Sequence, residues 1–308
     1  MIFSTHTYSC TLLAAALVFL AGCGGSGSTE STGFLSLGVS DHPMHDAEKV
    51  CITFDQIEFQ GEGGRSVVEL DPPEKVNLLE FQGANAAPIL MGHELPAGHY
   101  QWMRLGVDAV RGSNGGNGDT GGNACDGDAS YIFMEGGSVH NLYVPSGAQS
   151  GLKLVGGFTV PANSTANFTA EIDLMRSITS PPGLSPDVIF RPTIRLVNNV
   201  EVGTLTGQVS EELATAQACE PSVYVFDEDI EPNPIDEGDV VDPNDPVATA
   251  MVNARSNNDG TTTYHYTIGF LLADNYNVAF TCDGEIFEPE MGKPVTIQAG
   301  QLKTIDFP

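Results

Sequence analysis

The stretch TANFTAEIDL, residues 165–174, contains the clearest β-strand pattern in the chain. Every second residue in it is apolar: Ala166, Phe168, Ala170, Ile172 and Leu174. The residues between them are polar and include Glu171 and Asp173. Because successive side chains of a strand point to opposite faces, this alternation predicts a sheet that is buried on one side and solvated on the other.

Shorter stretches of the same kind recur along the chain. Apolar residues alternate over residues 35–39 and again over 50–54, after which the apolar phase slips to Ile57 and Phe59. This slip predicts a β-bulge near Asp55. The 35 glycines and 19 prolines supply frequent turns and leave no long periodic helix. Repeated short strands between turns predict an all-β fold made of β-sandwich domains.

The N-terminal segment carries an export pattern. Residues 11–21 are mostly apolar, but they are fewer than the roughly 20 residues that a membrane-spanning helix needs, and they suit a signal peptide. The next residues complete Leu20-Ala21-Gly22-Cys23, which resembles a bacterial lipobox. That resemblance implies that Cys23 carries the lipid. Residue 24 is Gly and not Asp. By resemblance to Gram-negative lipoproteins, this implies that the protein is located in the outer membrane. The segment departs from the usual signal-peptide pattern in one respect, because residues 1–10 contain no Lys or Arg.

Four parts are therefore expected. Residues 1–22 form a lipoprotein signal peptide, and residues 23–33 are the lipidated cysteine with a flexible Gly/Ser tether. The remainder, roughly 280 residues, suits two domains. We predict a first β-sandwich over residues 34–202 and a second over residues 203–308.

The formal charge of the chain is −28, from 40 acidic and 12 basic residues. Such a chain repels nucleic acid and anionic lipid headgroups, so neither is expected as an electrostatic partner. The predicted membrane contact is the lipid anchor alone.

The chain has six cysteines, of which Cys10 lies in the signal and Cys23 is the lipid attachment site. The four others are Cys51, Cys125, Cys219 and Cys282. An even number of cysteines in an exported protein favours disulfides. The chain has no Cys-x-x-Cys spacing, the pattern that would indicate a zinc site. Three connectivities are open, and one bridge in each predicted domain is the simplest.

Several motifs of the first predicted domain resemble the bacterial lipoprotein family named only as domain of unknown function 4382. They lie at residues 33–54, 95–105, 144–154 and 190–196, and Pro-Ser-Gly-x-x-Ser-Gly-Leu-Lys-Leu at 145–154 is the most specific. The resemblance covers residues 33–197. It implies an exported, largely β domain and no particular activity or catalytic residue.

The second predicted domain has strand patterns at residues 203–209, 223–226, 264–280 and 295–307. Tyr276, Val278, Phe280 and Cys282 fall on one face, which would turn Cys282 inward. This plan is similar to carboxypeptidase-regulatory-like and Cna-B-like modules, which are small transthyretin-like sandwiches. Some Cna-B modules carry a lysine–asparagine crosslink, but the first strand here has no lysine, so none is expected.

Two stretches are candidate metal sites. Asp41, His42, His45 and Asp46 place two imidazoles and two carboxylates within six residues, although a polar turn explains them as well. The loop from Arg111 to Asp128 offers Asp119, Asp126 and Asp128 to Ca²⁺, but without the spacing of an EF-hand. The alternative is a long hairpin loop anchored by Cys125. No cofactor is assigned, and Ca²⁺ stays open.

A further acidic stretch runs from Asp227 to Asp245 and is interrupted by prolines. Its composition predicts a solvated loop that buries no core, with weak cation binding as the alternative.

The leading functional hypothesis is a membrane-anchored, extracytoplasmic lipoprotein that acts as a non-enzymatic binding, adhesion or envelope-structural module. Its partner would be a protein or a carbohydrate, and Trp102 and the tyrosines could contribute to a carbohydrate-binding surface. The alternatives are a calcium- or transition-metal-binding accessory protein and a hydrolase that uses two carboxyls about 5–10 Å apart.

Overall fold

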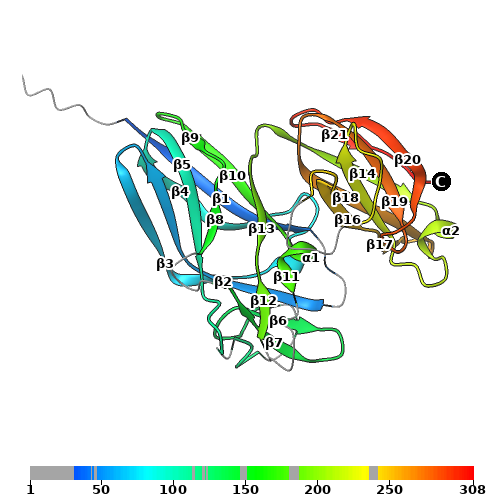
Figure 1. Cartoon of the computed structure of the whole chain (residues 1–308), viewed down its shortest axis with the longest axis horizontal. Helices are drawn as coiled ribbons and strands as arrows, with labels where there is room; N and C mark the ends of the chain where they lie inside the picture. The colour runs from blue at the N-terminus through cyan, green and yellow to red at the C-terminus, as the bar shows by residue number, and fades with distance from the viewer. Residues whose placement is uncertain are drawn as a thin grey trace, which may run out of the picture. The chain divides into compact units, whose positions relative to one another are not determined.

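The structure is a computed structural model. It describes residues 31–42, 44, 47–112, 115–119, 122, 124–145, 151–179, 187–235 and 242–308, apart from the side chains of His42 and Met175. Residues from Ser31 to Pro308 form one compact unit. Its regular structure is almost entirely β, and its sheets form separate sandwich-like domains, as the alternating patterns predicted (Figure 1). No helix among the described residues is long and apolar enough to cross a membrane.

The first sandwich contains a four-stranded sheet. Its order is β13 (Thr193–Asn198), β10 (Thr165–Asp173), β1 (Thr32–His42) and β4 (Ala87–Pro96). β1 and β10 run parallel, with Phe34 opposite Thr165, whereas the outer pairs are antiparallel. β1 is therefore an inner strand of its sheet.

The second sheet of this sandwich has nine strands. Its main path is β11 (Ile178–Thr179), β12 (Asp187–Phe190), β7 (Val139–Tyr143), β6 (Tyr131–Met134), β2 (Ala47–Gly61), β5 (Gly98–Val107) and β8 (Leu152–Leu154). β3 (Gly64–Asn77) also pairs with β2, and β9 (Phe158–Val160) with β5. The register of β2 shifts between Phe54 and Gln56 against both β3 and β5, which confirms the predicted bulge.

Apolar side chains of the two sheets share one core. Phe158 of β9 stacks on Tyr100 of β5 with ring centroids 5.1 Å apart, and meets Phe168 of β10 edge-on at 5.3 Å. These contacts join the nine-stranded sheet to the four-stranded one. Burying side chains of this size contributes about 1.5–3 kcal/mol each, before the entropy of ordering them is counted.

β10 confirms one half of its predicted pattern and corrects the other. Its apolar residues Ala166, Phe168, Ala170 and Ile172 are all buried. Thr169 and Glu171, which were expected on a solvated face, are only 0% and 3% exposed. Buried polar groups need partners. Here Thr169 Oγ1 donates to Asn199 Oδ1 at 2.9 Å, and Glu171 pairs with the cross-strand Arg195.

The strand also ends one residue earlier than predicted. Leu174 begins the short helix α1 (Leu174–Ser177), and the Asp173 carboxylate accepts a hydrogen bond from the Arg176 N–H at its start. Aspartate at this position satisfies an N–H group that the helix itself cannot.

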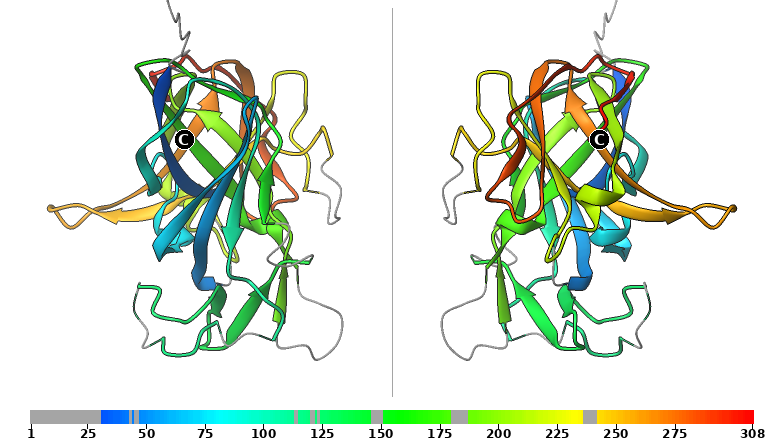
Figure 2. Two further views of the ribbon diagram at one scale, coloured as in Figure 1. Left: turned by 90° about the vertical axis from the view of Figure 1, so that its left-hand side faces the viewer. Right: turned by 90° about the vertical axis from the view of Figure 1, so that its right-hand side faces the viewer.

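Two four-stranded sheets form the second sandwich. One has the order β17 (Asn253–Ser256), β18 (Thr262–Leu272), β14 (Val202–Val209) and β21 (Leu302–Thr304). The other has the order β16 (Ala248–Met251), β15 (Ser222–Asp227), β19 (Asn275–Thr281) and β20 (Phe287–Thr296). Figure 2 shows the β17–β18 hairpin (gold to orange) projecting as an arm. Tyr276, Val278 and Phe280 lie in the core, and Cys282 packs against it, as the sequence predicted.

The acidic stretch from Asp227 to Asp245 contributes more to packing than its composition predicted. Ile230 and Ile235 pack against a small cluster that contains Tyr224, Phe226 and Phe287. Asn277 Nδ2 also donates to the Glu228 and Ile230 carbonyls, at 2.8 and 3.2 Å. The expectation of a fully solvated loop is therefore wrong for its first part, because two isoleucines among the acids find an apolar surface. Residues 236–241 lie outside the described residues.

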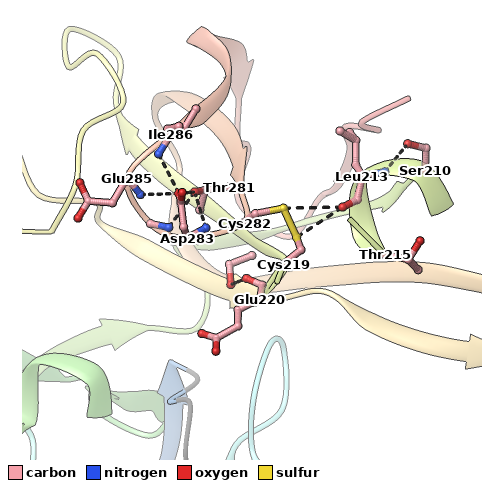
Figure 3. Close-up of a disulfide and its surroundings, with 12 residues drawn as sticks. Ser210, Leu213, Thr215, Cys219, Glu220, Thr281, Cys282, Asp283, Glu285 and Ile286 are labelled. Atoms are coloured by element: carbon pink, nitrogen blue, oxygen red, sulfur yellow. Dashed lines mark hydrogen bonds between the residues drawn. A yellow bond between two sulfur atoms is a disulfide. The ribbon is translucent and has the colours of Figure 1, made fainter. Parts of the chain in front are cut away.

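Two disulfides are present, Cys51–Cys125 and Cys219–Cys282. Of the three open connectivities, the chain has the one with a bridge in each sandwich. Figure 3 shows the second bridge beside α2 (Glu211–Ala214), with its two sulfurs 3.5 and 3.8 Å from the Leu213 carbonyl oxygen.

In the turn after β19, the Asp283 carboxylate accepts hydrogen bonds from the Glu285 and Ile286 N–H groups, and these bonds lower the pKa of Asp283.

Candidate functional site

The residues that the sequence singled out do not converge on one site in the described structure. Cys23, His45 and Asp46 lie outside the described residues, and only the backbone of His42 is placed, at the end of β1. Asp41 is 1% exposed, and its N–H donates to the Phe81 carbonyl at 3.0 Å. Among the described residues, no group of three or more His, Cys, Asp or Glu could hold a metal ion. The transition-metal hypothesis gains no support from Asp41.

Asp119, one of the three acids offered to Ca²⁺, has another role. Both of its carboxylate oxygens lie 2.9 Å from the Lys49 ammonium of β2, and the two side chains are only 2% and 3% exposed. The Tyr131 hydroxyl donates to the same carboxylate, and burial together with this bond raises the pKa of Tyr131. A carboxylate so fully occupied by donors within its own fold has little left to offer a calcium ion.

The rest of this loop is fixed in the same way. Lys49 also donates to the Ala124 carbonyl at 3.0 Å, and Lys75 of β3 donates to the Gly127 carbonyl at 2.7 Å. The Cys51–Cys125 bridge adds a covalent link to β2. The described parts of the loop from Arg111 to Asp128 are therefore tied to the sheet by two lysines and a disulfide, which is the structural alternative considered above.

A charged cavity of about 320 Å³ is a candidate site in the described part of the chain. It lies between β10, α1 and β13 on one side and residues 242–247, just before β16, on the other. Its charged lining consists of Glu171, Asp173, Arg176, Arg195, Asp227, Asp242 and Asp245. The cavity thus brings first-sandwich strands and the acidic stretch of the second sandwich together.

Both arginines that line this cavity form ion pairs with carboxylates. Arg176 Nε lies 3.5 Å from Asp173 Oδ2, Arg176 Nη1 lies 3.6 Å from Asp245 Oδ2, and Arg176 Nη2 donates to the Pro246 carbonyl at 2.9 Å. Arg195 Nη2 lies 2.5 Å from Glu171 Oε2. Each guanidinium is therefore held by carboxylates of its own chain.

What this cavity can do chemically follows from its lining. Among the described residues that line it, there is no His, Cys, Ser or Lys, so it contains no Ser–His, Cys–His or Ser–Lys pair. The arrangement instead joins the ends of three secondary-structure elements to the segment before β16. Sequence patterns did not reveal it, although the opposite charges of Glu171 and Arg195 on neighbouring strands are a recognised cross-strand pairing.

The pKa of Asp55 is raised, which bears on the hydrolase hypothesis. Partial burial is the larger cause of the higher pKa, and the negative charge of Asp108 adds to it. Asp55 sits at the bulge of β2, where the strand changes register. It does not line the charged cavity.

We expect Asp55→Asn to raise the melting temperature at pH 7, by about 1–2 °C. A carboxyl whose pKa is raised by folding binds its proton more tightly in the folded state. Folding stability therefore falls as the pH rises from 3.8 through the raised pKa, and the ionised group is unfavourable at pH 7. Thermal unfolding at pH 7 and pH 3.5 tests this, since the gain should shrink at the lower pH. A variant that melts lower at pH 7 would contradict it.

Comparison with known proteins gives one match that carries weight. The family described as domain of unknown function (DUF4382) matches residues 32–192, close to the range that the motifs indicated. No curated protein matches the chain.

Similar solved structures include two pilins and one protein proposed to be an adhesin. The minor pilin GBS52 of Streptococcus agalactiae is 9% identical, with 88% of this chain and 94% of that chain covered and a TM-score of 0.19. The Bacteroides ovatus protein is 8% identical, with 97% and 95% covered and a TM-score of 0.19. BcpA, the major pilin subunit of Bacillus cereus, is 7% identical, with 90% and 98% covered and a TM-score of 0.18.

At these TM-scores, no functional conclusion rests on the solved structures. The family match is different, because it spans just over half of the chain and includes β1, β10 and the disulfide-bonded loop between them. The chain belongs to the family described as domain of unknown function (DUF4382).

Proposed function

We propose that the chain is an extracytoplasmic lipoprotein, held at a membrane by acyl chains on Cys23, that works as a non-enzymatic binding, adhesion or envelope-structural module. The observation that carries this proposal is the pair of disulfides, one in each sandwich. Structural disulfides form and persist in oxidising compartments outside the cytoplasm. Leu20-Ala21-Gly22-Cys23 supports the anchor, and Gly24 supports the outer membrane of a Gram-negative cell.

The use of buried charge supports the non-enzymatic part of the proposal. Lys49 and Asp119 pair inside the fold, with side chains 3% and 2% exposed, and connect segments 70 residues apart in sequence. Catalytic sites more often leave such a group facing a cleft. The two four-stranded sheets of the second sandwich support a Cna-B-like accessory module.

We expect Cys23→Ala to move the protein from the membrane fraction to the soluble extracytoplasmic fraction. Several acyl chains at about 0.8 kcal/mol per buried methylene make release slow, and without them an acidic chain has no attraction to anionic headgroups. Cell fractionation with metabolic labelling by a palmitate analogue measures both location and acylation. Cys10→Ala is the matched control and should leave both unchanged, because Cys10 lies in the expected signal. An unlabelled wild type, or a Cys23→Ala protein that stays in the membrane, would contradict the proposal.

A further inference from the structure

A group of basic and aromatic side chains gathers on the outward face of the nine-stranded sheet. We call it the Trp102 surface, and it consists of Arg65 of β3, Trp102 and Arg104 of β5, and Lys153 of β8 (strands labelled in Figure 1). The neighbours of these residues along the strands point into the core, with Met103, Leu105, Leu152 and Leu154 at most 2% exposed. The side chains between them consequently face away from the core.

The register of the strands places these residues side by side. Arg104 lies opposite Lys153 on one edge and opposite Glu58 of β2 on the other. One row along, Gln60 of β2 lies between Trp102 and Arg65. Residues directly opposite on neighbouring strands have Cβ atoms about 4.5–5.5 Å apart, so the group is continuous across four strands.

The cations are held in place by Trp102 and Glu58. Arg104 Cζ lies 5.1 Å and Lys153 Nζ 5.2 Å from the Trp102 ring centroid, which are cation–π distances. Arg104 Nη1 donates to one Glu58 carboxylate oxygen at 3.2 Å, and Arg65 Nη2 donates to the other. Because these contacts order the side chains before any ligand arrives, less rotamer entropy remains to be lost on binding.

The sign of the charge here is opposite to that of the whole chain. Arg65 and Arg104 pair with one buried carboxylate, Glu58, and Lys153 lies opposite Arg104, in a chain whose formal charge is −28. Among the described residues, Lys153 has no carboxylate partner, although the chain has 40 acidic residues. Charges more than about 8 Å away are screened at physiological ionic strength, so a ligand at this surface meets these cations together with Glu69, which lies two residues beyond Val67 on the same face of β3.

The surface is open and carries apolar groups at its margins. Arg65 is 53% exposed, and Val67 of β3 and Val155 after β8 are 45% and 76% exposed. Small molecules favour concave pockets that enclose them. A row of cations, an indole and two valines along a sheet face suits instead an extended polymer that alternates apolar and anionic groups.

We infer that the Trp102 surface binds an anionic polysaccharide, one whose sugar rings carry carboxylate or sulfate groups. The acidic groups would meet Arg65 and Lys153, and the C–H faces of the sugar rings would meet Trp102 and the valines. An anionic membrane is disfavoured as the occupant, because its extended negative plane would also face the remaining acids of the chain. This inference rests on the proposed binding function and names its ligand class.

The test uses residues 31–308, which form a compact unit with both cores. Isothermal titration calorimetry would measure binding of dextran sulfate, polygalacturonate and uncharged dextran. We expect both acidic polysaccharides to bind, dextran not to bind, and 0.5 M NaCl to weaken binding strongly. Lys153→Gln and Trp102→Ala should each reduce affinity about tenfold. Lys153 is exposed, so its variant keeps the fold even if the Trp102 variant is destabilised.

The matched control is Lys303→Gln, an exposed lysine on β21 of the second sandwich, which should bind like the wild type. Equal affinity of Lys153→Gln and the wild type would overturn the inference, as would the failure of both acidic polysaccharides to bind. Binding that depends on Lys153 but is seen only with phosphatidylglycerol vesicles would overturn it in favour of a lipid surface. Residues 31–308 lack Cys23, so none of these results alters the outcome of the anchoring test.

Discussion

Replacing Lys49 by methionine is expected to lower the free energy of unfolding by about 3–5 kcal/mol. The substitution leaves the Asp119 carboxylate, which is 2% exposed, without the cation that contacts both of its oxygens. It also removes the donor to the Ala124 carbonyl. Removing one partner of a buried ion pair costs far more than the pair itself contributes, because the other charge is then buried alone.

Urea unfolding followed by circular dichroism measures this effect. Asp119→Asn should also be destabilising, because it leaves the Lys49 ammonium, which is 3% exposed, without its counter-charge. The double variant Lys49→Met/Asp119→Leu should recover part of the loss, since neither charge remains. Lys303→Met, at an exposed lysine, is the control and should stay within about 0.5 kcal/mol of the wild type. A loss below about 1 kcal/mol for Lys49→Met would mean that Asp119 is solvated.

The double substitution Cys219→Ser/Cys282→Ser is expected to destabilise the second sandwich by about 4 kcal/mol. The bridge joins residues 63 apart in sequence, and cutting it restores the conformational freedom of that loop to the unfolded chain. Trp102, the only tryptophan, lies in the first sandwich. Its fluorescence should therefore report the unfolding of the first sandwich alone, while far-ultraviolet circular dichroism reports both.

In the variant, the circular dichroism transition should begin at a lower urea concentration than the Trp102 transition. Cys51→Ser/Cys125→Ser is the matched comparison and should shift the Trp102 transition instead, because that bridge connects β2 with the loop before β6. Coincident transitions in the Cys219→Ser/Cys282→Ser protein would show that the two sandwiches unfold as one cooperative unit. An unchanged stability would show that the bridge constrains little in the unfolded chain.

The sequence predicted local features better than those that depend on distant segments. The apolar face of β10 and the bulge of β2 follow from a period of two residues and one slip in it, so the chain near those residues contains the whole signal. The burial of Glu171 does not follow from such a local pattern. It depends on Arg195 lying opposite on β13 and on the segment that lines the other side of the charged cavity, and a pattern along one strand contains neither.

The same reason explains the errors in the two loops. Asp119 appeared available to Ca²⁺ because its partner Lys49 is 70 residues earlier in the chain. Ile230 and Ile235 looked isolated among acids because the cluster against which they pack is completed by Ala279 and Phe287, which belong to strands much later in the chain. Composition describes the average character of a segment, whereas burial depends on the surface that the segment meets.

The parallel pairing of β1 with β10 has a consequence for the order in which the chain folds. β4 can cover one side of β1 early, but the partner on the other side begins only at Thr165. Until that residue has been made, β1 presents an unpaired row of backbone N–H and C=O groups, which is a template for association with other chains. A chain halted before Thr165 should therefore aggregate or require a chaperone, because until then the first sandwich lacks the second partner of β1.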